Sequence, residues 1–148
     1  LPIFGTSIIN YNMATFTRTF GLLLKSGVKI TEALDITALT LTNPVYRKEL
    51  LGSAETIRQG EFLSKYLSSN ARAFPTLLVN MIEVGENTGN LTENLSYLAD
   101  YYENEVDDFV KNLSSILEPV LLLFMGGIVG FIALSFITPI YQVTRTIK

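Results

Sequence analysis

The sequence predicts an all-α protein: an antiparallel bundle of five to six helices, the last of which continues into a single transmembrane helix. Three observations lead to this fold class. Apolar residues recur at spacings of three and four through most of the chain, as they do along one face of an α-helix. No segment sustains the alternating pattern of a β-strand. Residues 119–140, PVLLLFMGGIVGFIALSFITPI, carry no charge.

The composition restricts the chemistry that the protein can perform. The chain contains no His and no Cys, so it has no imidazole base, no cysteine nucleophile, no disulfide and no zinc site of the usual ligands. Its 11 basic and 14 acidic residues give a net charge of −3, which does not favour nucleic acid as a partner. Nothing in the sequence indicates a cofactor. The mean hydropathy of +0.33 is high for a soluble domain of 148 residues.

The first eleven residues are expected to form a connector, because Pro2 and Gly5 interrupt LPIFGTSIIN and no helical stripe develops. The helical pattern starts at Asn12 and ends at Gly27. Its apolar face consists of Phe16, Phe20, Leu23 and Leu24. The chain begins with Leu instead of Met, so we expect it to be a fragment of a longer protein.

Start and stop signals define the second and third helices. Thr31 is the expected N-cap of the second helix, since its hydroxyl suits the free N–H groups and Glu32 follows in the first turn. Asn43 and Pro44 together mark the start of the third helix: Asn caps it, and Pro at the first helical position gives up a donor that would be unpaired anyway. Gly60 ends this helix.

Two further helices are expected before the last one. A short helix spans about residues 62–67 and is followed by the polar stretch SSNARA. Pro75 then opens a fifth helix. Its inner face consists of Leu78, Met81, Ile82 and Gly85.

The last helix carries a narrow apolar stripe that enters the charge-free segment without a stop signal. The stripe consists of Leu91, Leu95, Leu98, Tyr102, Phe109, Leu113 and Ile116, opposite Glu93, Asp100 and Asp107. A helix of roughly 20 apolar residues crosses a bilayer, so a membrane span is favoured over a buried core helix. We therefore expect a bundle over 12–112, a transmembrane helix over 113–140 kinked at Pro119, and a tail over 141–148.

The stretch MIEVGENTGNL, residues 81–91, allows four interpretations. A calcium loop needs oxygen ligands at alternate positions, which the spacing of its acids does not provide. A phosphate-binding loop needs a different glycine pattern after a strand. A catalytic carboxylate pair would use Glu83 and Glu86, but at a helix end both are expected to face water.

The fourth interpretation, a sharp corner between two helices, fits every residue of the stretch. Gly85 allows a close approach to the next helix, and Gly89 suits the left-handed position that ends a helix. Asn90 then caps the last helix, with Glu93 three positions later completing a pair of the capping-box type.

Four segments together resemble a known family. They are GVKITEAL, FPTLLVNMIEVGENTGNL, YLADYYENEVDDFV and LEPVLLLFMGGIVGFIALSFITPI. They resemble, in the family's order, the type II secretion F domain, which occurs in inner-membrane platform proteins of type IV pili and type II secretion systems. LPIFG is similar to the segment that follows a preceding transmembrane helix in those proteins. The chain thus looks like the C-terminal repeat and final span of such a protein.

The resemblance implies a non-enzymatic function. Such a platform lies in the inner membrane of a bacterium or related prokaryote, with its bundle in the cytoplasm, and couples a hexameric ATPase to pilin assembly. The implied partners are the assembly or retraction ATPase, pilin or pseudopilin subunits, other inner-membrane assembly proteins and further copies of the chain. The residues Gly85, Glu86, Gly89 and Asn90 form the family signature and are a candidate partner contact. The resemblance applies equally to pilus, secretion and competence platforms.

Two carboxylates and two glycines are further candidate sites. By helical angle Glu105 lies near the apolar stripe, where it either reaches water at the rim or meets a basic group, on Arg18 or Lys25 or on a neighbouring protomer. Glu118 is expected to anchor the helix at the membrane surface, or alternatively to pair with the N-terminus of a pilin. Gly126 and Gly130 form GxxxG, a pattern that favours close helix contact in lipid but also occurs by chance.

Two arguments oppose parts of this interpretation. The positive-inside rule would place the tail, with Arg145 and Lys148, in the cytoplasm, whereas the resemblance places the bundle there and the tail outside. We follow the resemblance. The alternative function is a membrane-anchored adaptor that recruits another cytoplasmic protein. An enzyme is disfavoured because no converging polar groups indicate an active site.

Overall fold

The structure, a computed structural model, describes the backbone of residues 2–147 and the side chains of residues 4–147. Over these residues it contains six α-helices and no β-strand, which confirms the predicted all-α class. The chain divides into two compact units. We call Leu1–Asp107 the bundle unit and Asp108–Lys148 the span unit.

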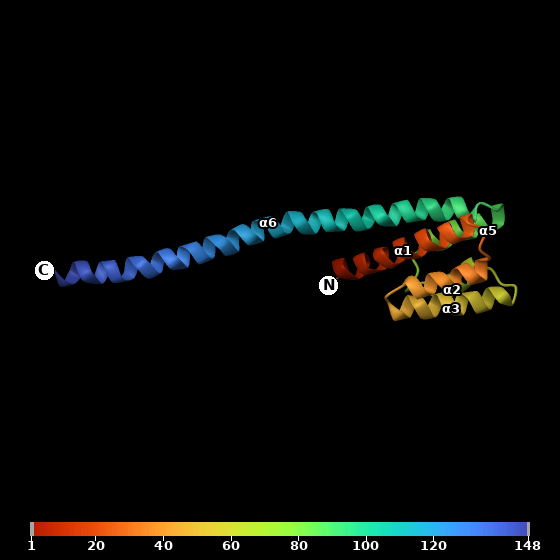
Figure 1. Cartoon of the computed structure of the whole chain (residues 1–148), viewed down its shortest axis with the longest axis horizontal. Helices are drawn as coiled ribbons and strands as arrows, with labels where there is room; N and C mark the ends of the chain where they lie inside the picture. The colour runs from red at the N-terminus through yellow and green to blue at the C-terminus, as the bar shows by residue number, and fades with distance from the viewer. Residues whose placement is uncertain (1, 148) are drawn as a thin grey trace. The chain divides into compact units, whose positions relative to one another are not determined.

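The bundle unit contains five helices and the beginning of a sixth (Figure 1). Their bounds are α1 Pro2–Lys25, α2 Ile30–Thr40, α3 Pro44–Arg58, α4 Leu63–Ser69, α5 Thr76–Thr88 and α6 Leu91–Thr146. The direction of the chain reverses from α1 to α2 and from α2 to α3, and α2 lies against α3 (Figure 1). The predicted antiparallel packing is therefore confirmed.

The core of the bundle unit draws on every helix in it. Its largest fully buried side chains are Met13, Phe16, Phe20, Leu34, Leu41, Leu50, Leu63, Leu67, Leu78, Ile82 and Leu95. Phe74, which precedes α5, packs edge-on against both Phe16 and Tyr46, with ring centroids 6.5 and 5.9 Å apart. A connecting segment therefore contributes one of the central aromatic contacts.

Several helix boundaries follow the sequence signals, and one does not. The side chain of Asn43 accepts a hydrogen bond from the Val45 N–H, and α3 starts at Pro44, as predicted. The prediction that Thr31 caps α2 is wrong. Lys29 occupies that position in an extended conformation, and its carbonyl accepts the hydrogen bond of the Ala33 N–H at 2.8 Å. Thr31 therefore already lies in the first helical turn.

The expected connector over residues 1–11 is also wrong where the structure describes it, because residues 2–11 belong to α1. Proline is tolerated in the first turn of a helix, and one interior glycine costs only about 1 kcal/mol. The gain is the packing of Ile9 against the core. Leu1 lies outside the described residues.

The span unit consists of the remainder of α6, which continues through Pro119 and Pro139 to Thr146. It contains the candidate membrane span of the described chain, and none of that apolar window is buried. The predicted continuation of the last helix into an apolar span is confirmed. Most of the expected tail is helical, and Lys148 lies outside the described residues. The kink at Pro119 stays a prediction.

Candidate functional site

The stretch 81–91 forms a tight corner between α5 and α6. Gly89 has φ +75°, the left-handed conformation that glycine adopts most easily. The carbonyl of Gly85 accepts hydrogen bonds from the N–H groups of both Gly89 and Asn90, the latter at 3.1 Å. These bonds satisfy the end of α5 and turn the chain directly into α6. The corner interpretation is thus the one that the geometry supports.

Gly85 is the point at which the two helices come closest. A Cβ atom at this position would lie 2.7 Å from the Cα and 3.1 Å from the backbone nitrogen of Leu91. Real side-chain carbons do not approach a backbone so closely, and a backbone cannot rotate away as a side chain can. The predicted close approach at Gly85 is therefore present, and it excludes any larger residue without a shift of α6.

Glu86 has a structural role that the sequence did not reveal. We expected its carboxylate to face water, but one oxygen accepts the Leu63 N–H at 2.7 Å and the other accepts the Ser64 N–H at 3.0 Å. The carboxylate therefore caps α4, where a negative charge is favoured by the free N–H groups. Phe62, the residue before α4, has no side chain that can do this. The one signal in the sequence is a helix start without a capping side chain of its own, but this signal does not identify the acceptor 23 residues away.

The capping pair predicted for Asn90 and Glu93 does not form among the described residues. Such a pair needs the backbone N–H of Asn90 to be free for the Glu93 carboxylate. That N–H is already donated to the Gly85 carbonyl at 3.1 Å. Asn94 provides another bond at this place, from its side-chain amide to the Met81 carbonyl at 2.8 Å.

A shallow groove of about 560 Å³ lies beside the corner. We call it the corner groove. Its lining combines apolar side chains with the corner itself: Leu24, Ile30, Ile57, Gly60, Glu61, Phe62, Gly85, Glu86, Gly89, Leu91 and Thr92. Phe62, which lines the groove, is more than half exposed. The corner thus gives shape to an open apolar surface and does not enclose a reaction chamber.

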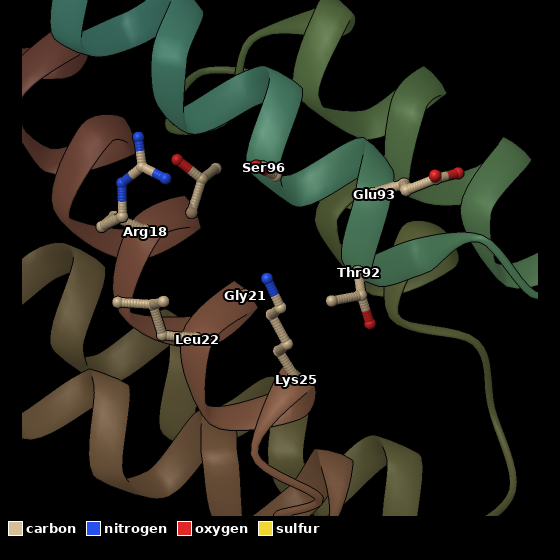
Figure 2. A pocket seen from close by; sticks show the side chains of 8 residues that line it. Arg18, Gly21, Leu22, Lys25, Thr92, Glu93 and Ser96 are labelled. Atoms are coloured by element: carbon tan, nitrogen blue, oxygen red, sulfur yellow. The ribbon is translucent and has the colours of Figure 1, made fainter.

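A second, more polar cleft of about 250 Å³ lies between α1 and α6 (Figure 2). Gly21 forms part of its wall, and a Cβ atom there would lie 3.2 Å from the Cβ of Leu95. Lys25 extends into the cleft, whereas the carboxylate of Glu93 points away from both Lys25 and Arg18 (Figure 2). The acidic and basic side chains that line the cleft therefore point in different directions (Figure 2).

Arg18 binds two carboxylates of α6. Its guanidinium donates to both oxygens of Glu103, each at 2.8 Å, and to Asp100 at 2.6 Å. The hydrogen bonds that Arg18 donates, first to Glu103 and then to Asp100, raise the pKa of Arg18, and the contact with Arg18 lowers the pKa of Glu103. Asp100 was expected on a solvated face and Glu103 was not identified. An exposed basic residue on one helix does not indicate which acid of another it will meet.

Glu105 makes no ion pair with any residue that the structure describes, because Arg18 is taken by its two neighbours. Of the alternatives predicted for Glu105, the contact with Arg18 or Lys25 does not form among the described residues, and the position at the rim in water fits the structure. The side chain of Glu105 is exposed. A contact with another protein stays a prediction.

The candidate residues of the span unit are exposed within that unit. A Cβ atom at Gly126 or Gly130 would meet no atom within 4 Å. Glu118 is exposed at the start of the charge-free segment. Their roles in helix contact and membrane anchoring stay predictions.

Comparison with known proteins places this chain among related sequences. The family model for the type II secretion system (T2SS) protein F matches residues 16–139. The type IV pilus assembly protein PilC of Thermus thermophilus is 40% identical over 148 residues, all of this chain and 36% of that protein. The type II secretion system protein F of Pseudomonas aeruginosa is 31% identical over 147 residues, 99% of this chain and 36% of that protein. The chain thus spans about a third of the length of these relatives.

The bundle, its corner and the exposed apolar helix define a helical protein with a candidate membrane span. The match extends through both units and covers far more than half of the chain. The chain belongs to the family of the type II secretion system protein F.

Proposed function

We propose that the chain is a non-enzymatic part of an inner-membrane platform in a type IV pilus or type II secretion machine. The observation that carries the proposal is the family match over residues 16–139, which includes the bundle, the corner and the apolar span. Relatives that match the whole chain are named for type IV pilus assembly, and others are named for type II secretion.

In this proposal the span unit crosses the inner membrane and the bundle unit lies in the cytoplasm. The bundle contacts a hexameric assembly or retraction ATPase, and the platform passes the resulting motion to pilin or pseudopilin subunits. Further copies of the chain and other inner-membrane assembly proteins complete the platform. ATP is hydrolysed by the partner.

Two features of the structure support a role in contact over one in catalysis. The carboxylate of Glu86 is occupied by two backbone N–H groups and is not free to act as an acid or base. The corner groove instead offers the open apolar surface that protein contacts use.

A pull-down of the detergent-solubilised chain with the assembly ATPase of the same organism tests the proposal. Gly85 and Glu86 are unsuitable as contact probes, because both hold the bundle together. Phe62→Ser removes an exposed ring from the corner groove, and Leu39→Ser removes an exposed side chain of α2 as the matched control. We expect wild type and the control to capture the ATPase and Phe62→Ser to capture several-fold less. Failure of well-folded wild type to capture it would favour the adaptor alternative.

The proposed orientation can be tested by cysteine labelling, because the chain contains no Cys of its own that would react. A membrane-impermeant maleimide is applied to spheroplasts carrying Leu39→Cys or Ile147→Cys. We expect Ile147→Cys to react in intact spheroplasts and Leu39→Cys to react only after lysis. The opposite pattern would place the bundle outside and contradict the proposal.

A further inference from the structure

The helices α5 and α6 share an exposed face that neither the corner groove nor the polar cleft includes. We call it the tyrosine face. Its exposed members are Leu77 and Val84 on α5 and Tyr97 and Tyr101 on α6. The half-buried Met81, which packs against the core, and Asn94 join the two helices beneath it. The side-chain amide of Asn94 donates to the Met81 carbonyl at 2.8 Å, which places the two rows side by side. Tyr97 is 59% exposed and Val84 53%, although both are large hydrophobic side chains.

Helical spacing keeps each row on one flank of its helix. The residues of each row, Met81 and Asn94 included, are three or four positions apart, and residues at these spacings are neighbours on a helix surface. The core-facing residues of the same helices are different ones: Leu78 and Ile82 on α5, and Leu95, Leu98 and Tyr102 on α6. The tyrosine face is therefore a second apolar surface beside the core. Exposed tyrosines with aliphatic neighbours are the composition that protein interfaces favour.

The charged residues of the segment that carries this face have one sign. Residues 73–107 contain seven acids and no Lys or Arg; the acids are Glu83, Glu86, Glu93, Asp100, Glu103, Glu105 and Asp107. Glu86 caps α4, and Asp100 and Glu103 bind Arg18. Glu93 and Glu105 have no ion-pair partner among the described residues, and each lies four positions from a tyrosine of the face. In Figure 2 the Glu93 carboxylate points away from the basic residues of α1.

We propose that the tyrosine face binds a basic amphipathic helix of another protein. The apolar side chains of that helix lie against Val84 of α5 and against Tyr97 and Tyr101 of α6, as one helix packs on a pair of others. Its Lys or Arg side chains pair with Glu93 and Glu105. An anionic lipid surface is disfavoured as the occupant, because it would be repelled by the same carboxylates.

Photo-crosslinking of the full chain in the membranes of its own organism tests this inference. Tyr97 is replaced by p-benzoylphenylalanine, and the crosslinked segment is identified by mass spectrometry. The same replacement at Leu39, which is 72% exposed on α2, is the control for an apolar site elsewhere. We expect Tyr97 to capture one helical segment with an excess of Lys and Arg, and Leu39 not to capture it.

A charge reversal completes the test. Glu105→Lys is expected to lower the crosslinking yield at Tyr97 about fivefold, the loss that one exposed ion pair of about 1 kcal/mol would cause. Glu32→Lys makes the same change in net charge on α2 and should leave the yield unchanged. Equal yields in the two variants would overturn the inference. So would capture of lipid, of a second copy of the chain or of a segment without excess basic residues, or no capture at all.

The inference rests on the proposed function only in assuming that the bundle contacts another protein, and the two fail differently. A basic helix from a protein with no part in pilus assembly or secretion would contradict the proposed function and retain the inference. An acidic or uncharged segment of an assembly protein would do the reverse.

Discussion

The bundle unit and the span unit use apolar side chains in opposite ways, although α6 contributes to both. In the bundle unit Leu95, Leu98 and Tyr102 are buried beneath the other helices. In the span unit every described residue from 111 to 147 is exposed. Exposed apolar surface costs about 25 cal/mol per Å² in water, so the span unit needs a different solvent. The neighbours of a helix, and not its hydrophobicity alone, decide whether it forms a core or a membrane surface.

Polar groups differ between the units in the same way. In the bundle unit some of them join separate helices, as Glu86 does for α4 and Arg18 for α6, beside local bonds such as that of the Thr37 hydroxyl to the Ala33 carbonyl. In the span unit the hydroxyls of Ser135 and Thr138 donate to carbonyls four residues earlier in their own helix. Local bonding is what a helix in lipid requires, because no water is present to accept the hydroxyl protons. Polar side chains therefore specify the fold only in the first unit.

The largest expected difference between the units comes from the deletion of one leucine side chain. Leu98→Ala leaves a cavity in the bundle core, and we expect it to lower the free energy of unfolding by about 2–5 kcal/mol. Leu122→Ala removes the same atoms from an exposed position of the span unit and should leave the melting temperature unchanged. Circular dichroism at 222 nm during heating in detergent measures both. Similar losses in the two variants would mean that the span unit has a packed core of its own.

Two glycine substitutions, one in each unit, test the same difference in packing. Gly85→Ala forces a carbon against the Leu91 backbone and should destabilise the bundle by about 1–3 kcal/mol, as overpacked sites do. Gly126→Ala meets no atom within 4 Å and exchanges glycine for a residue that favours helix by about 1 kcal/mol. We expect the melting temperature to fall for Gly85→Ala and to stay constant or rise for Gly126→Ala. A neutral Gly85→Ala would show that α6 moves away from α5 easily.

The local signals in the sequence predicted most of the fold. Periodicity identified the helices, Asn43 and Pro44 marked a boundary, and Gly85 and Gly89 marked the corner, because each acts through its own backbone or its nearest turn. The error at residues 2–11 arose where packing outweighed a weak propensity. The error at Thr31 is a displaced boundary, since the helix begins after Lys29 instead of after Thr31. A breaker residue costs little when the helix that contains it gains contacts elsewhere.

The contacts of the candidate site were less predictable, because they join residues far apart in the chain. Glu86 lies 23 positions from the N–H that it caps, and Arg18 lies 85 positions from Glu103. Several acids of α6 were equally available to Arg18 on sequence grounds. Only the positions of the helices in space select between them.

A smaller effect is expected when the cap of α4 is weakened. Glu86→Gln keeps one carbonyl oxygen but places an amide NH₂ against the second backbone N–H, and we expect a loss of about 1–2 kcal/mol. Glu83→Gln, one turn earlier on α5, changes an exposed carboxylate with no ion pair among the described residues and serves as the control. Amide hydrogen exchange at Leu63 and Ser64 should quicken in the first variant only. Equal exchange in both would contradict the capping role.

The smallest effect concerns the ion pair between α1 and α6 and has a defined dependence on pH. Because the contact with Arg18 lowers the pKa of Glu103 below its ordinary value of 4.5, the folded state binds the Glu103 proton less readily than the unfolded state. The stabilisation is therefore complete above about pH 4.5 and is lost as the pH falls through the lowered pKa. Both side chains are more than a third exposed, so solvent screening limits the effect to roughly 1 kcal/mol or less.

Melting temperatures of wild type and Glu103→Gln between pH 7 and pH 3 measure this contribution. We expect wild type to melt a few degrees higher at pH 7, since about 1 kcal/mol shifts a domain of this size by roughly 4–8 °C at most. The difference should shrink below pH 4.5, where the carboxylate of Glu103 becomes protonated and resembles the amide. A difference that stays constant to pH 3 would show that Glu103 stabilises the bundle by packing instead of by charge. Residues 108–147 of the span unit form no ion pair with one another, so their helical signal should not change over the same range.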